Sequence, residues 1–104
     1  MRYEAWLRRR LVVKTATLQT GERLVVDAYD ARERMLIEAK ASASRQDVRM
    51  AIGQLLDYRR HSDKKASLAL LLPDRPTDDL VDLLHGLRVL VIFEAERRFK
   101  TLRP

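Results

Sequence analysis

The chain has 104 residues, which is enough for one domain over residues 1–104 with a modest hydrophobic core and leaves no room for a separate recognition domain. It has no cysteine, which excludes a disulfide framework and a zinc–thiolate site and fits a reducing cytoplasm. Lys and Arg number 21 against 15 acidic residues, and the net charge of +6 favours a polyanionic partner, although basic proteins of many functions share such an excess.

The sequence predicts an α/β domain whose elements follow the order αβββαβαβ. A short helix is expected over residues 3–10, with Trp6 in the core, and strands over residues 11–18, 23–30 and 34–41. Ser44 is a good N-cap for a second helix that runs to about residue 60. A continuous apolar run predicts a strand over residues 66–72 that is buried on both faces. Thr77 then caps a helix through residue 85, and a last strand covers residues 87–93.

The second and third strands are expected to form a hairpin that turns at Arg32 and Glu33. That turn pairs residue 30 with residue 35 and residue 28 with residue 37, and so sets Asp27 opposite Glu38. Opposed residues share one face, with Cβ atoms about 5 Å apart. Lys40, two residues beyond Glu38, belongs to the same face.

Two carboxylates that face each other repel, and a divalent cation between them would remove that repulsion. The neighbours expected on their face, Val25, Tyr29 and Leu36, are apolar and argue against two carboxylates standing in open solvent. Oxygen ligands suit magnesium or manganese, whereas zinc prefers histidine or cysteine at a ligand spacing that this sequence lacks.

The second helix carries a polar flank beside its apolar stripe. Gln54 and Tyr58 lie one turn apart on a common edge, from which they can reach a site on the neighbouring sheet. Gly53 costs about 1 kcal/mol in a helix interior relative to alanine, and we interpret it as a point of close approach to the sheet or to a phosphate.

Asp27, with Glu38-Ala39-Lys40 beginning eleven positions later, resembles the catalytic core of the PD-(D/E)XK nucleases, the restriction-endonuclease-like superfamily. The element Gln54-x-x-x-Tyr58 is similar to the Gln-x-x-x-Tyr motif of its RecB-like branch. The likeness covers roughly residues 3 to 94. It implies an αβββαβ core with a mixed central sheet flanked by helices.

The resemblance also implies roles for individual residues. Asp27, Glu38 and the backbone carbonyl of Ala39 would hold Mg²⁺, for which Mn²⁺ can substitute. Lys40 would orient or deprotonate the attacking water and offset charge on the phosphate. Gln54 would bind a phosphate oxygen, a water or the lysine.

Other residues have two interpretations of similar weight. Glu4 is either a further acidic residue near the metal or an ordinary glutamate that faces water. Tyr58 either reaches the site or covers the edge of the core. Arg45 and Arg49, one turn apart, either hold phosphate or are simply solvated. Asp30 falls on the face opposite Asp27 unless a bulge intervenes.

Three hypotheses follow from the sequence. The first is a magnesium-dependent DNA nuclease, expected to be an endonuclease, that serves restriction, defence or repair. It would act either as a homodimer or as the nuclease portion of a larger assembly. RNA stays open as a substrate, because metal and lysine act on the phosphate and not on the sugar. The second is a non-catalytic nucleic-acid-binding or assembly module of the same fold, and the third is a basic interaction protein with a coincidental likeness. No contact with a membrane is expected.

Overall fold

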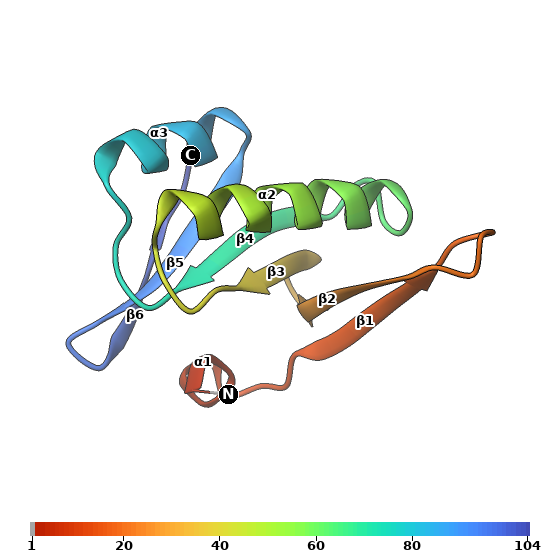
Figure 1. Cartoon of the computed structure of the whole chain (residues 1–104). Coiled ribbons are helices and arrows are strands. Elements are labelled where there is room, and N and C mark those ends of the chain that lie inside the picture. The colour runs from red at the N-terminus through yellow and green to blue at the C-terminus, as the bar shows by residue number, and fades with distance from the viewer. Residues whose placement is uncertain (1) are drawn as a thin grey trace.

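The computed structural model describes residues 2–104, which form three helices and six strands (Figure 1). The helices are α1 (Arg2–Leu7), α2 (Arg45–Arg60) and α3 (Asp78–Gly86). The strands are β1 (Val12–Thr17), β2 (Arg23–Asp30), β3 (Met35–Ala39), β4 (Ser67–Leu72), β5 (Val89–Ala95) and β6 (Arg98–Leu102). The predicted order is therefore confirmed as far as β5.

The six strands form one mixed sheet in which spatial order equals chain order. The first three strands form an antiparallel meander, β4 and β5 follow in parallel with β3, and β6 returns antiparallel to β5. Each parallel step is made through a helix, α2 between β3 and β4 and α3 between β4 and β5. The expected α/β class with a mixed sheet is thus confirmed. Because β3, β4 and β5 are parallel, their carboxyl ends lie along one edge of the sheet.

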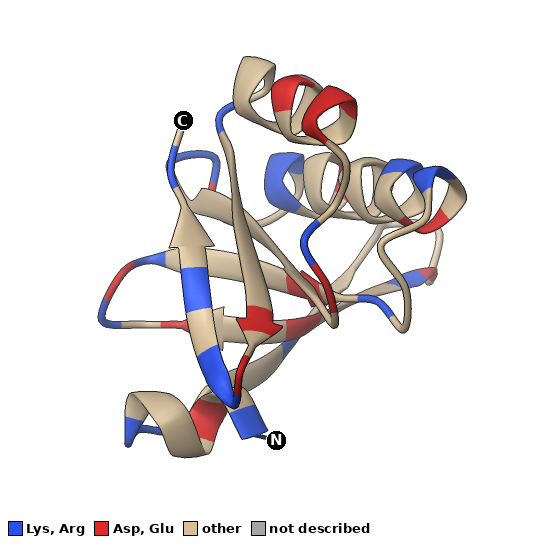
Figure 2. Ribbon diagram, turned by 90° about the vertical axis from the view of Figure 1, so that its left-hand side faces the viewer, with Lys and Arg blue, Asp and Glu red and all other residues tan. Residues whose placement is uncertain are grey.

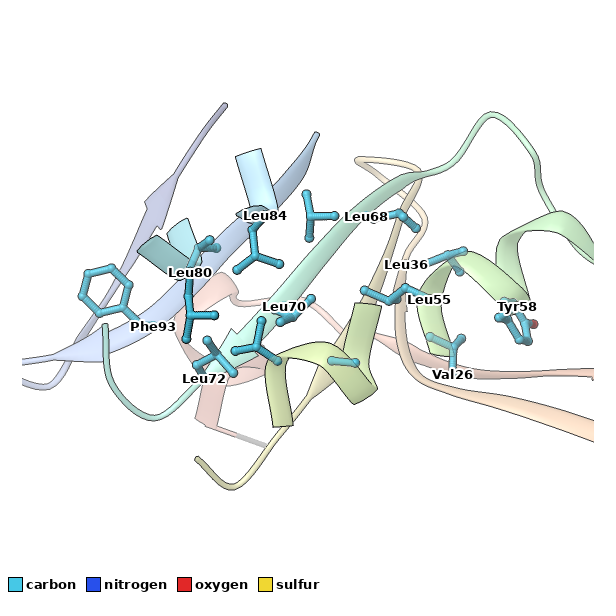
Figure 3. Close-up of a cluster of buried hydrophobic side chains, with 14 of the residues drawn as sticks. Val26, Leu36, Leu55, Tyr58, Leu68, Leu70, Leu72, Leu80, Leu84 and Phe93 are labelled. Carbon is cyan, nitrogen blue, oxygen red and sulfur yellow. The ribbon is translucent and has the colours of Figure 1, made fainter. Parts of the chain in front are cut away.

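Helices cover both faces of the sheet unequally (Figure 1). The larger apolar cluster joins α2 and α3 to one face and includes Leu36, Leu55, Leu70 and Leu84 (Figure 3). A smaller cluster lies on the other face under α1 and includes Tyr3, Ile37 and Ile92. Successive residues of β4 alternate between the two clusters, which confirms the prediction that this strand is buried on both faces.

Helix α2 begins after Ser44, the N-cap that the sequence predicted. The hydroxyl oxygen of Ser44 accepts the backbone N–H of Asp47 at 3.2 Å, which satisfies one of the free donors of the first turn. Helix α1 is shorter than expected and ends at Leu7, because Arg8 takes a left-handed backbone conformation with φ of 57°. Trp6, which we expected in the core, leaves 47% of its surface exposed.

Strand β6 is an element that the sequence did not predict. Its exposed residues are Arg98, Lys100 and Thr101, whereas Phe99 and Leu102 are half-buried, and Figure 2 shows the basic positions along the strand as blue bands. Ala95 pairs with Arg98, which leaves Glu96 and Arg97 as a two-residue turn with φ of 54° and 63°. Asparagine and glycine are the usual residues in such a turn, and neither is present to mark it.

Candidate functional site

The β2–β3 hairpin has the register that the sequence predicted. Ala28 pairs with Ile37 and Asp30 with Met35, and one further step in this register brings Asp27 opposite Glu38. The ladder stops before that step, because the Asp27 carboxylate oxygen Oδ2 accepts the backbone N–H of Ala39 at 3.0 Å. A side chain thus takes the place of a strand partner at the end of β3.

A bulge in β2 sets the direction of Asp27. Val12 pairs with Tyr29 and Lys14 with Val26, so a two-residue step along β1 faces a three-residue step along β2. Val26 therefore packs on the α2 side of the sheet, whereas Ala28 packs on the α1 side. Val25 is 55% exposed on the side away from Val26, so the expectation that it shares a face with the carboxylates is wrong.

Glu38 is buried in an unusual way for a carboxylate. Only 5% of its surface is exposed, and its oxygen Oε1 has no hydrogen-bond partner in the structure. The other oxygen, Oε2, lies 3.6 Å from the Nζ of Lys40. Burial and, after it, the charge of Asp27 raise the pKa of Glu38 to about 7, although Lys40 acts in the opposite direction.

Lys40 completes the group at the end of β3. Its backbone N–H donates to the carbonyl of Leu71 at 3.1 Å, which fixes the chain beside β4, and its side chain is only 15% exposed. Asp27, Glu38 and Lys40 are therefore brought together as the sequence predicted. Asp27 is exposed, however, so the expectation that neither carboxylate stands in open solvent is wrong for this residue. We call these three residues the carboxylate–lysine site.

The carboxylate–lysine site could hold an ion of the magnesium type, which takes part of its ligands from water and substrate, but not a metal that needs protein ligands alone. Among residues 2–104, no group of three or more His, Cys, Asp or Glu side chains is placed to hold a metal. Magnesium, however, is commonly bound by one or two carboxylates together with water and substrate phosphate. The unpartnered oxygen of buried Glu38 is the observation that favours a cation here.

The backbone of Ala39 points in a direction that suits this arrangement. In an extended strand the N–H and C=O of one residue lie on the same side of the chain. Since the Ala39 N–H faces Asp27, its carbonyl faces the same side and can add a third oxygen to the two carboxylates.

Glu4 does not join this group. Its oxygen Oε2 accepts the backbone N–H of Leu11 at 2.9 Å, and this hydrogen bond lowers the pKa of Glu4. Glu4 thus ties α1 to the start of β1. Asp30 lies on the α1 side of the sheet, where Arg9 binds both of its carboxylate oxygens, so its exclusion from the predicted site agrees with the structure.

The two residues of the helix motif have different environments. Tyr58 is 3% exposed, packs near Val26 in the larger apolar cluster (Figure 3), and has a pKa raised by burial. Gln54 is exposed and lines a shallow hollow with Arg23, Val25 and Tyr58, to which the carboxylate–lysine site does not contribute. Tyr58 is therefore a core residue, and Gln54 faces the start of β2 rather than the carboxylates.

The two arginines at the start of α2 are both exposed. Arg45 also forms an ion pair with Asp79 at the start of α3. Binding of a phosphate by Arg45 would require that ion pair to exchange. Gly53 is exposed, and a Cβ atom there would meet open space, so our interpretation of a close approach to the sheet at this residue is wrong.

Comparisons of the chain with protein-family models, with curated proteins and with solved structures find no match in any of the three. Within the part of the chain that the structure describes, no helix has both the length and the apolar character needed to cross a membrane.

Proposed function

We propose that this protein is a magnesium-dependent nuclease that hydrolyses phosphodiester bonds in DNA. The observation that carries the proposal is the buried Glu38 carboxylate, which has an unpartnered oxygen, stands opposite Asp27 and lies 3.6 Å from the Lys40 ammonium. Natural chains seldom retain a buried carboxylate oxygen without a hydrogen-bond partner, because an unsatisfied buried polar atom destabilises the fold. Restriction, defence and repair are the settings that the sequence resemblance suggests.

The arrangement of the elements supports a restriction-endonuclease-like fold. Helix α1, the meander β1–β2–β3, helix α2 and strand β4 parallel to β3 follow the αβββαβ order that the resemblance implies. The carboxylates lie on the second and third strands of that core, and Lys40 follows at the end of the third.

Each residue of the site has a distinct part in the proposed reaction. Asp27, Glu38 and the Ala39 carbonyl would hold a divalent cation, which when bound supplies positive charge to the phosphate and makes a coordinated water more acidic. Lys40 donates hydrogen bonds from its ammonium group, and so orients the attacking water and offsets charge on the phosphate oxygens. The water oxygen forms a bond to phosphorus and gives up a proton to solvent, while the bond to the 3′ oxygen breaks and that oxygen takes up a proton. The products are a 5′-phosphate and a 3′-hydroxyl.

A cleavage assay tests the proposal directly. Supercoiled plasmid and linear DNA are incubated with the purified protein in MgCl₂, MnCl₂ or EDTA, with Lys40→Ala and the exposed-residue control Lys64→Ala alongside. We expect cleavage only with metal, and a loss of at least ~100-fold in Lys40→Ala but not in Lys64→Ala. Cleavage that persists in EDTA or in Lys40→Ala refutes the proposed site, and DNA binding without any cleavage points to the non-catalytic module instead.

A further inference from the structure

A recess separate from the hollow beside Gln54 lies next to Lys40, on the α1 side of the edge formed by the carboxyl ends of β3, β4 and β5. Its lining includes Tyr3 from α1, Lys40 after β3, Leu71 and Pro73 at the end of β4, Glu94 from β5 and Phe99 from β6. We call this recess the edge pocket. Leu71 and Phe99 belong to the apolar cluster under α1, whereas Glu38 follows Leu36 on the α2 side. The edge pocket and the carboxylates therefore meet at Lys40, which contributes to both.

The interior of the edge pocket is apolar and aromatic. The rings of Tyr3 and Phe99 meet edge to face with centroids 5.1 Å apart, and Phe99 is only partly buried. Leu71 and Pro73 supply the aliphatic wall, and proline brings no backbone N–H to it. Such a wall offers van der Waals and stacking contacts to a flat ring.

The rim of the edge pocket is polar. Arg2 and Glu94 form an ion pair of 2.8 Å across it, with the Arg2 side chain 80% exposed and that of Glu94 21% exposed. In Figure 1 and Figure 2 the turn between β5 and β6 accordingly lies close to α1. The rim thus presents both hydrogen-bond donors and acceptors, whereas the Glu94 carboxylate disfavours a second phosphate inside the pocket.

We propose that the edge pocket receives the base of the nucleotide next to the scissile phosphate, and that the protein therefore acts on strands whose bases are unpaired at the cut. The inference rests on the proposed nuclease function, which places the phosphate at Lys40. A flat ring with hydrogen-bonding edges matches aromatic walls and a charged rim. A base within a duplex is stacked and paired, so it reaches such a recess only from a single strand or after extrusion from the helix.

Nucleotide binding without metal tests the pocket independently of cleavage. Uniformly ¹⁵N-labelled protein in EDTA is titrated with thymidine 5′-monophosphate and 2′-deoxyadenosine 5′-monophosphate, and separately with 2-deoxyribose 5-phosphate. We expect saturable amide shifts at Leu71, Glu94 and Phe99 with the nucleotides only. Equal shifts with the base-free sugar phosphate, or no shifts at these residues with any probe, overturn the proposal.

Variants of Phe99 test whether its ring is what the base contacts. Phe99→Leu keeps apolar packing against Tyr3 but removes the flat ring, and it serves beside Phe99→Ala in case the smaller side chain disturbs the fold. Trp6→Ala is the matched control, because Trp6 contacts Phe99 with ring centroids 6.2 Å apart but does not line the edge pocket. We expect nucleotide affinity to fall by at least ~5-fold in both Phe99 variants. Unchanged affinity in a folded Phe99→Leu protein overturns the assignment.

Cleavage assays separate the failure of this inference from the failure of the proposed function. Labelled single-stranded and duplex oligonucleotides of one sequence are compared, and a single abasic nucleotide is moved along the single strand. We expect faster cleavage of the single strand, and slower cleavage when the abasic site lies at one fixed position beside the cut. Metal-dependent cleavage that ignores both features overturns the edge-pocket proposal and leaves the nuclease standing. Base-dependent amide shifts without any cleavage support the pocket and overturn the nuclease.

Discussion

Glu38 is expected to make the metal-free protein less stable as the pH rises. The pKa of this carboxyl group is raised in the folded protein from 4.5 to about 7, chiefly by burial and then by the charge of Asp27. Between these two values the folded protein binds more protons than the unfolded chain, so the free energy of unfolding falls with increasing pH. Replacing Glu38 by glutamine, which is neutral at every pH and similar in shape, removes this dependence.

The size of the effect follows from the shift. Each pKa unit corresponds to about 1.36 kcal/mol, so a rise of about 2.5 units makes the ionised Glu38 cost about 3 kcal/mol above pH 7. The attraction of Lys40 is already contained in this value, since it is one of the causes of the shift. We therefore expect Glu38→Gln to match the wild type at pH 4 and to exceed its stability by about 3 kcal/mol at pH 8.

Urea unfolding followed by circular dichroism, in EDTA from pH 4 to pH 8.5, measures this difference. Glu22→Gln, which changes an exposed glutamate in the β1–β2 turn, controls for the loss of one negative charge. Parallel stability profiles for the wild type and Glu38→Gln would refute the reasoning. Added MgCl₂ should stabilise the wild type at pH 8 and have little effect on Glu38→Gln, because only the wild type has both carboxylates.

Three further predictions concern stability alone. Arg9→Ala should lower the urea midpoint far more than a substitution at an exposed arginine, because it leaves the 1% exposed Asp30 without its charged partner; an unchanged midpoint would contradict this. Replacing the turn pair Glu96 and Arg97 by Asn and Gly should raise the free energy of unfolding by about 1–2 kcal/mol, since both positions have positive φ; a lower urea midpoint would show that the original side chains stabilise the turn. Gly53→Ala should raise the free energy of unfolding by about 1 kcal/mol, because alanine favours the helix and the new Cβ meets open space. A lower melting temperature in differential scanning calorimetry would reveal a clash instead.

The hairpin that carries the carboxylates was predictable because the position of its turn fixes every cross-strand residue pair. Placing the turn at Arg32 and Glu33 determined the pairs 28–37 and 30–35, which the structure has. The bulge beside Asp27 was not predictable, because it depends on how β1 meets β2 and no glycine marks it. It changed the surroundings expected for Asp27, although not its place opposite Glu38.

Helix periodicity predicted a shared edge for Gln54 and Tyr58 but not their burial. The two residues are one turn apart, yet Tyr58 is covered by the sheet and Gln54 is exposed. Tyr58 packs in the larger apolar cluster with Val26, whereas Gln54 lines an open hollow beside the start of β2. The extent of such tertiary cover is not contained in the spacing of residues along one helix.

The burial of Glu38 links the stability of the fold to the proposed chemistry. A leucine or glutamine at this position would avoid the cost of desolvating a charge beside Asp27, so stability alone does not explain a glutamate there. The same low-polarity surroundings strengthen the attraction of the Glu38 carboxylate for a cation, and few waters can screen the Lys40 ammonium, whose side chain is only 15% exposed. The site therefore destabilises the fold when no cation is bound and becomes favourable when a cation and a phosphate are both present.

Binding of substrate and metal together should consequently stabilise the protein more than the sum of their separate effects. Thermal unfolding in CaCl₂, with and without a single-stranded oligonucleotide, would measure this difference. Strictly additive effects would show that the carboxylates and the bound strand do not interact.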